Sequence, residues 1–314
     1  MLYLLLIVGL ALLIFGGDIL VRGAVSIALK LKISTLVVGM TIVALGTSLP
    51  ELLISLQAAL KGSSEIALGN VLGSNIANLG LVLGITTLIF PIVVDRNSLR
   101  IDWPVMMFAS LLLLVFIYNQ QLTWIEGVIF LLILTIFNTS IIYFSRRMFK
   151  KDLQRAELEE VDETKKELPL WKAIGFIVFG TGGLLLGAEW FLDGAIGIAE
   201  QLGVSQHVIA VTLVAFGTSV PELSASVIAA FKKETDISVG SLIGSNIYNI
   251  LLILGVTSTV KEISITDIVL DFDIWWVLGI GLLFMIFMIP NRKINRVKGL
   301  VFFLAYCVYI YLSF

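Results

Sequence analysis

The stretch VALGTSLPELLIS at residues 43–55 decides the fold, because it recurs as VAFGTSVPELSAS at residues 214–226. A second stretch, GNVLGSNIANL from Gly69, recurs as GSLIGSNIYNI from Gly240. Both recurrences are offset by the same 171 positions. A constant offset predicts two copies of one structural unit rather than two chance matches.

The same offset extends beyond these motifs. It aligns GGDILVRGAVSIALKL from Gly16 with GAEWFLDGAIGIAEQL from Gly187. We therefore predict a first unit at residues 1–147 and a second at 170–314, joined by a linker at 148–169. The linker contains the only stretch too polar to enter a bilayer, and it is shorter than the ~50 residues of a small folded domain.

The composition is that of a membrane protein. Hydrophobic residues make up 58% of the 314 residues and charged residues only 14%, and the mean hydropathy is +1.03. These values lie outside the usual balance of soluble domains. The formal net charge of −2 offers no basic surface for nucleic acid, and the single cysteine, Cys307, excludes a disulfide framework.

Apolar stretches long enough to cross a bilayer recur almost to the last residue. They fall near residues 2–29, 34–60, 66–92, 101–118 and 122–145, and then near 171–200, 205–231, 237–260, 269–290 and 297–314. Five helices per unit is an odd number, so the second unit must enter the membrane upside down. The sequence therefore predicts an all-α polytopic membrane protein with ten transmembrane helices in two inverted five-helix repeats, an architecture typical of alternating-access transporters.

Basic residues predict the orientation in the membrane. If the amino terminus is extracellular, 19 of the 21 Lys and Arg residues face the cytoplasm, and only Lys61 and Lys261 lie outside. The positive-inside rule then places both termini outside the cell membrane and the linker 148–169 in the cytoplasm.

Two glutamates carry the functional signal. Glu51 and Glu222 lie inside the second and seventh apolar stretches, at the same position of each repeat. A carboxylate there costs about 2.5–3.5 kcal/mol on insertion scales, and neither stretch holds a deep Lys or Arg to balance it. A bound cation would do so. The competing interpretation is a neutral glutamate that hydrogen-bonds a neighbouring helix.

A proline precedes each glutamate, as Pro50 and Pro221. Proline removes a helical hydrogen bond and opens the turn before it, which frees backbone carbonyls that a cation can bind. The adjacent hydroxyls add oxygen ligands in the same turn, at Thr47, Ser48, Thr218 and Ser219. The alternative is a kink that only shapes helix packing.

The following apolar stretch of each copy adds a serine and an asparagine at positions i and i+4, on one helical face. These are Ser74 with Asn78, and Ser245 with Asn249. Alone, they could simply hydrogen-bond between helices. Together with the glutamates they form an oxygen-only ligand set, which suits calcium and sodium rather than zinc or copper.

The duplicated GTSLPE and GTSVPE, followed by GSNIAN and GSNIYN, closely resemble the two alpha-repeats of the calcium/cation antiporter superfamily, in particular its sodium/calcium exchanger branch. The compact chain looks like a prokaryotic member. The resemblance implies that calcium binds Glu51 and Glu222 with the Thr47 and Thr218 carbonyls. It further implies that sodium uses the same glutamates with Ser48, Ser219, Ser74, Ser245 and the Ala44 and Ala215 carbonyls, and that Asn78 and Asn249 line the centre.

One departure bears on the coupling ion. Potassium-dependent members of the superfamily carry Asp where this chain has Asn249, which argues against potassium cotransport. The cation/proton branch looks different, with a glutamate near the positions of Asn78 and Asn249. We therefore expect sodium/calcium antiport, with calcium/proton antiport as the main alternative.

Other function classes are less consistent with the sequence. A cation channel would need a continuous pore rather than one duplicated site. An enzyme would need a nucleophile or metal centre, and no G-x-S-x-G or H-E-x-x-H motif occurs. We expect calcium and sodium as transported ions, a lipid bilayer as surroundings, and neither a cofactor, a nucleic acid nor an obligatory protein partner.

Charged residues also occur in the first helix of each repeat. Asp18 and Arg22 stand at i and i+4, where we expect a local ion pair. Their counterparts, Glu189 and Asp193, are both acidic, so no equivalent pair can form there. We expect these two carboxylates to line a vestibule.

Overall fold

The structure is a computed structural model that describes residues 1–96, 98–156, 168–204 and 215–313. Its described residues form mainly helices, with four two-residue strands and short connecting turns and loops. Before the linker, the elements are α1 (Leu2–Leu31), α2 (Thr35–Val38), η1 (Gly39–Val43), α3 (Ala44–Thr47), α4 (Leu49–Leu60), α5 (Ser64–Ala77), η2 (Asn78–Val82), α6 (Leu83–Ile89), β1 (Ile92–Val93), η3 (Ser98–Asp102), α7 (Trp103–Ile117), β2 (Gln121–Leu122) and α8 (Trp124–Ala156). After it come α9 (Leu170–Gln201), α11 (Ala215–Gly217), α12 (Val220–Phe231), α13 (Thr235–Tyr248), η5 (Asn249–Leu254), α14 (Gly255–Val260), β3 (Ile263–Ser264), η6 (Val269–Asp273), α15 (Ile274–Met288), β4 (Lys293–Ile294) and α16 (Arg296–Leu312).

Seven helices within the described ranges are long and apolar enough to span a membrane, or eight if the bent pair of 35–47 and 49–60 is one span. Two shorter helices, α12 and α16, add to them. Large apolar side chains such as Val115, Ile136 and Phe179 are exposed on the outer faces, where lipid rather than water suits them. The chain is therefore a multi-pass membrane protein. The predicted stretch 205–231 begins outside the described residues.

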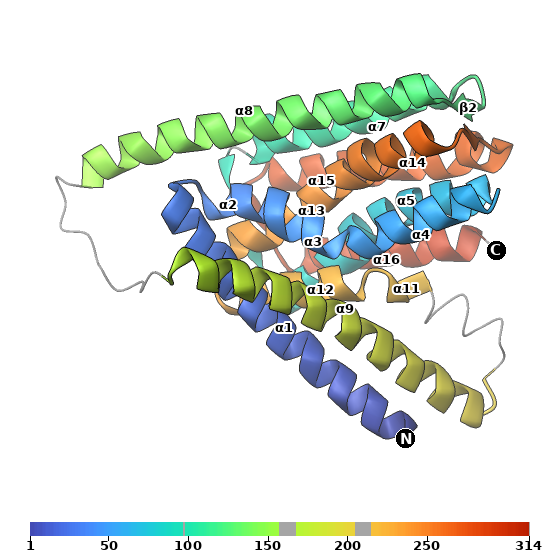
Figure 1. The fold of residues 1–314 in the computed structure, drawn as a ribbon, viewed down its shortest axis with the longest axis horizontal. Coiled ribbons are helices and arrows are strands. Elements are labelled where there is room, and N and C mark those ends of the chain that lie inside the picture. Colours follow the sequence, from blue (N-terminus) through green and yellow to red (C-terminus); the bar gives the residue numbers. More distant parts are fainter. Residues whose placement is uncertain (97, 157–167, 205–214, 314) are drawn as a thin grey trace.

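The predicted linker is partly helical. Helix α8 continues through Ala156, and α9 begins at Leu170, while residues 157–167 lie outside the described ranges. The end of α8 and the start of α9 lie at the left of Figure 1, opposite the amino terminus and the end of α16.

Two spans form the centre of the bundle. In residues 64–89 and 235–260, 78% and 89% of the apolar window is buried, against 28–39% in the other long spans. Each contains a π-helical turn, η2 or η5, and these turns start 171 positions apart. A π turn widens the helix by one residue and occurs mostly at functional sites.

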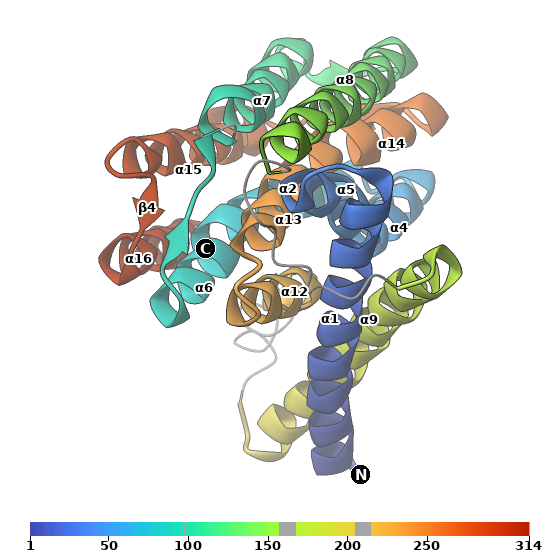
Figure 2. The ribbon, with the colours of Figure 1, turned by 90° about the vertical axis from the view of Figure 1, so that its left-hand side faces the viewer.

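Helices α1 and α9 lie against each other along their length, antiparallel, and cross the rest of the bundle obliquely (Figures 1 and 2). Glycines allow this close approach. A Cβ atom on Gly180 would lie 2.6 Å from the backbone nitrogen of Leu20, and one on Gly16 would lie 2.8 Å from that of Leu184. Such small-residue contacts let two membrane helices gain dispersion energy over a long seam.

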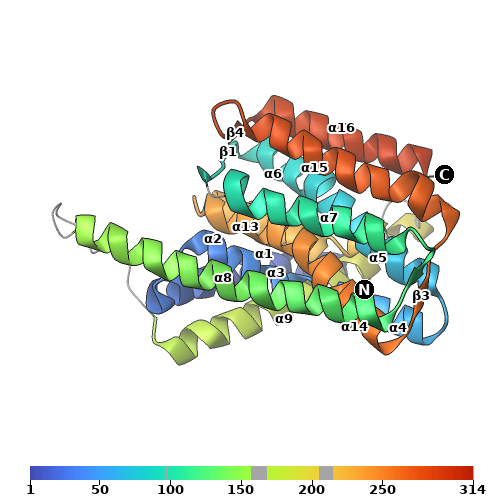
Figure 3. The same cartoon turned by 90° about the horizontal axis from the view of Figure 1, so that it is seen from above.

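The strands connect the halves of the chain that precede and follow the linker. Strand β1 pairs antiparallel with β4, with Ile92 opposite Ile294, and β2 pairs antiparallel with β3, with Leu122 opposite Ile263. The two pairs lie at opposite ends of the bundle (Figure 3). Helix packing follows the same exchange, because α6 contacts α16 and α14 contacts α8.

Candidate functional site

The site begins with two interrupted helices. Helix α3 ends at Thr47 and α4 starts at Leu49, with a 46° bend between the 35–47 and 49–60 segments. Ser48 and Ser219 sit at the two breaks with ψ values of 4° and 0°, outside the α-helical range. Pro50 and Pro221 follow within the first helical turn, where the missing N–H costs no intrahelical bond. The breaks thus occur where the sequence predicted opened turns.

Each break places a glutamate in the first turn of the following helix, Glu51 in α4 and Glu222 in α12. The glutamates are only 1% and 2% exposed. Oε2 of Glu51 and both carboxylate oxygens of Glu222 have no hydrogen-bond partner among the described residues. The two side chains are close enough to interact electrostatically. Two buried carboxylates without partners are unfavourable unless a cation neutralises them.

Buried neutral oxygens belong to the same set. The hydroxyls of Ser48, Ser219 and Ser74 are buried and lack hydrogen-bond partners among the described residues. Oδ1 of Asn78 and both side-chain polar atoms of Asn249 also lack them. Native interiors rarely leave so many polar atoms unpaired. Such a concentration of unpaired polar atoms makes these helices a candidate ligand-binding site.

Packing between the two halves brings these groups together. Helix α4, which carries Glu51, contacts η5, which begins at Asn249, and α12, which carries Glu222, contacts η2, which begins at Asn78. The Thr47 hydroxyl lies 3.5 Å from that of Ser245. The helices that carry the two glutamates therefore pack against the asparagine-bearing π turns of the other half.

Three of the predicted ligands are not described as buried oxygens without hydrogen-bond partners. The Ala44 carbonyl already accepts bonds from the Ser48 N–H at 3.0 Å and the Thr47 hydroxyl at 3.3 Å, which leaves it limited capacity for an ion. Thr218 is partly exposed and lines a cavity. Ala215 begins α11, but its side-chain surroundings lie outside the described residues.

Three further asparagines, which were not among the predicted ligands, hold the site together. Asn70 donates to the Glu51 carbonyl at 3.2 Å and to the Ser55 hydroxyl at 2.9 Å. Asn75 donates to the carbonyl of its own counterpart, Asn246, at 3.3 Å, across the junction between the halves. The duplicated GSN tripeptide was a signal for the last two, because both copies keep an amide beside the ligand serine.

A cavity of about 590 Å³ opens beside the breaks, lined by Pro50, Thr218 and Pro221 and by Glu189 and Asp193 of α9. Both acidic residues are exposed although they belong to a long apolar helix. Carboxylates at such a position indicate contact with water. Glu189 and Asp193 thus line one cavity together, and their negative charge favours cations there.

No three His, Cys, Asp or Glu side chains in the described ranges converge as a metal cluster. The two glutamates would therefore share an ion with neutral oxygens, which suits the hard cations calcium and sodium rather than a His- or Cys-bound metal.

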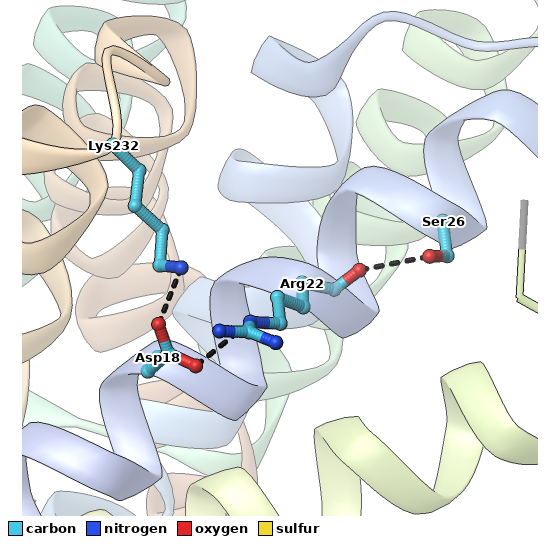
Figure 4. Close-up of polar contacts among 4 residues, drawn as sticks. All are labelled: Asp18, Arg22, Ser26 and Lys232. Atoms are coloured by element: carbon cyan, nitrogen blue, oxygen red, sulfur yellow. Dashed lines mark hydrogen bonds and ion pairs between the residues drawn. The ribbon is translucent and has the colours of Figure 1, made fainter. Parts of the chain in front are cut away.

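Asp18 and Arg22 form the predicted local ion pair, with Nε to Oδ2 at 2.8 Å (Figure 4). Lys232, at the end of α12, binds the other carboxylate oxygen of Asp18. The group ties α1 to the helix that carries Glu222.

Fold and site together define an integral membrane protein that handles cations. The family model described as "Sodium/calcium exchanger protein" matches residues 1–143 and 172–314. The chain belongs to this family of secondary transporters, which are not enzymes, and it is a cation/calcium antiporter.

Individual relatives cover nearly the whole chain. A protein of Alkalimonas amylolytica, provisionally named antiporter CaxA, is 38% identical over 98% of this chain and 97% of its own length. The sodium/calcium exchanger MaX1 of Methanosarcina acetivorans is 34% identical over 99% of this chain and 98% of its own. A solved structure of the sodium-calcium exchanger NCX_Mj, soaked with Na⁺ and Sr²⁺, is 33% identical and covers 98% of this chain and 96% of its own, with a TM-score of 0.81.

Proposed function

We propose that this protein exchanges sodium for calcium across the cell membrane, through one site that opens alternately to the two sides. The observation that carries the proposal is the pair of buried glutamates, Glu51 and Glu222. Oε2 of Glu51 and both carboxylate oxygens of Glu222 lack hydrogen-bond partners among the described residues. Two carboxylates neutralise one calcium ion or two sodium ions. A third sodium ion would make the exchange electrogenic.

The ligands are assigned as follows. Calcium binds Glu51 and Glu222 with the carbonyls of Thr47 and Thr218. Sodium uses the glutamates with hydroxyls and carbonyls of the same turns, from Ser48, Ser219, Ser74, Ser245, Ala44 and Ala215, while Asn78 and Asn249 line the centre. The unpaired hydroxyls of Ser48, Ser219 and Ser74 support this assignment, as do the unpaired side-chain atoms of Asn78 and Asn249. The Ala44 carbonyl is the least supported of the proposed sodium ligands, because it already accepts two hydrogen bonds.

Alternating access rests on an architecture of ten spans in two inverted repeats, residues 1–147 and 170–314, joined by the linker 148–169. Three structural features support it. Turns η2 and η5 recur at the offset of 171, as do η3 and η6, and the strand pairs lie at opposite ends of the bundle. In this arrangement both termini are extracellular and the linker is cytoplasmic.

Calcium uptake into proteoliposomes tests the proposal. The purified chain would be reconstituted, loaded with sodium, potassium or acidic buffer, and diluted into a common medium containing labelled calcium. Uptake only from sodium-loaded vesicles is the expected result. Uptake driven only by a proton gradient would identify a calcium/proton antiporter, and flux independent of every gradient would identify a cation channel.

Electrogenic coupling has its own measurement. If three sodium ions leave for each calcium ion that enters, uptake moves net positive charge out of the vesicle. A potassium diffusion potential set with valinomycin, negative outside, should then accelerate calcium uptake. A rate independent of the imposed potential would instead establish electroneutral exchange of two sodium ions.

A further inference from the structure

A second acidic cavity is lined both by the later turns of α8 and by the first turn of α13. It has a volume of about 220 Å³ and is lined by residues of α2, η3, α8 and α13. Its polar residues are Ser34, Asp95, Asp102, Ser145 and Asp236. None of them belongs to the candidate transport site, and none of the described lining residues is Lys or Arg.

Asp102 is the decisive residue of this cavity. It is the last residue of η3 and is 1% exposed, yet its Oδ2 atom has no hydrogen-bond partner among the described residues. The counterpart of Asp102 in the second half is Asp273, and there the carboxylate accepts a hydrogen bond from the Tyr309 hydroxyl at 3.1 Å. A tyrosine hydroxyl thus binds the carboxylate in the second half, whereas one oxygen of Asp102, Oδ2, stays an open acceptor in the first half.

The neighbouring groups strengthen the negative potential. Asp95 lies close enough to interact electrostatically with both Asp102 and Asp236. Asp95 has a partner of its own within the chain, so Asp102 remains the available carboxylate. The Ser145 hydroxyl accepts from the Ser34 N–H at 2.8 Å and donates to the Ser34 hydroxyl at 3.4 Å. These bonds hold two hydroxyl oxygens at the cavity wall.

We propose that this cavity binds a partly hydrated divalent cation, with the Asp102 carboxylate as its principal ligand and Asp236 as a second, longer-range charge. Carboxylate, hydroxyl and water oxygens are the ligands of calcium and magnesium. Because the described carboxylates do not converge as a three-residue metal cluster, the ion keeps several waters, for which the cavity has room. The proposal does not depend on sodium coupling at the transport site.

Equilibrium binding of radioactive calcium separates this site from the transport site. The full chain would carry Glu51→Gln and Glu222→Gln, which remove both transport carboxylates. One weakly bound calcium ion per chain should remain, and excess magnesium should displace it. Adding Asp102→Asn should weaken this binding by roughly 10- to 100-fold. The matched control, Asp273→Asn, should leave it unchanged.

Two results would overturn the proposal: no residual calcium binding in the double variant, or equal binding with and without Asp102→Asn. Size-exclusion chromatography shows whether each variant is folded. If Asp102→Asn is not recovered, Asp236→Asn decides, because Asp236 is partly exposed and easier to replace. Weakening by about threefold or more supports the site, and unchanged binding overturns it. Calcium uptake by the wild-type chain is measured separately, so failure of sodium exchange would be recognised as such.

Discussion

Asp18 and Lys232 form an ion pair, whereas Glu189 and Lys61, their counterparts in the other half, form none among the described residues. The unpaired Glu189 instead lines the large cavity beside the proline breaks. The two halves thus share sequence motifs and element order but differ in the ion pairs that their charged residues form. Two halves with the same motifs can therefore be joined by an ion pair at one position and remain open at the corresponding position. Under alternating access, we expect the opposite state to pair Glu189 with Lys61 and to separate Asp18 from Lys232.

The largest expected effect concerns a feature that the two halves share, the buried glutamate after the proline. Glu51→Gln and Glu222→Gln should each lower sodium-driven calcium uptake by at least about 100-fold, because removing one charged partner of a buried ionic site costs about 3–5 kcal/mol. Initial uptake rates in proteoliposomes measure this. A variant that retains most of its activity would show that the two carboxylates do not share one ion.

The next effect concerns the contact between α1 and α9. Gly180→Ala places a methyl group against the backbone of Leu20, and we expect a loss of about 1–3 kcal/mol of stability from overpacking. Gly182→Ala is the matched control on the same helix, since no described atom lies within 4 Å of its added Cβ. Thermal unfolding in detergent compares the two. Equal melting temperatures would mean that the seam adapts to a methyl group.

A smaller effect should distinguish the surroundings of the two glutamates. Asn70 holds the Glu51 carbonyl, whereas its counterpart Ser241 donates to the Ser238 carbonyl at 2.9 Å instead. Losing the Asn70 bond should cost about 0.5–1.5 kcal/mol, which corresponds to a roughly two- to tenfold weaker calcium half-saturation. Ser241→Ala should change this constant less than about twofold. The reverse order would refute a positioning role for Asn70.

The smallest effect belongs to the ion pair. Lys232→Met should lower stability by only about 0.2–1 kcal/mol, because the pair is partly exposed to solvent. Lys61→Met should have no effect in the state described, since Lys61 makes no ion pair with Glu189. High salt should reduce the difference between the two variants. Equal losses in thermal unfolding would indicate that both ends are tied in solution.

Much of the fold could be predicted from hydropathy alone, because lipid requires long apolar helices with satisfied backbones. The predicted stretches 2–29 and 171–200 correspond to α1 (Leu2–Leu31) and α9 (Leu170–Gln201). The helical extension of α8 to Ala156 was less visible, because polar residues outside a bilayer carry no hydropathy signal.

The candidate site was predictable from the residues whose side-chain chemistry is unusual inside a membrane. Buried glutamates after prolines are costly enough to require a reason, and three of their four carboxylate oxygens have no hydrogen-bond partner among the described residues. The π turns at Asn78 and Asn249 were not predictable, since one extra residue in a helical turn depends on tertiary packing. The open acceptor on Asp102 was not predictable for the same reason. Only the folded chain shows that the Tyr309 hydroxyl binds Asp273, whereas Oδ2 of Asp102 has no hydrogen-bond partner among the described residues.

The exchange of strands and helices between the halves has a consequence for biosynthesis. Helix α8 packs against α14, which is synthesised about one hundred residues later, and α6 packs against α16, which follows later still. When the first half has left the ribosome, the faces of α6 and α8 that will contact these helices, and the edges of β1 and β2, are still unpaired. The first half must therefore persist in the bilayer as an incomplete intermediate, and quality-control proteases have their best opportunity to remove the chain during that interval.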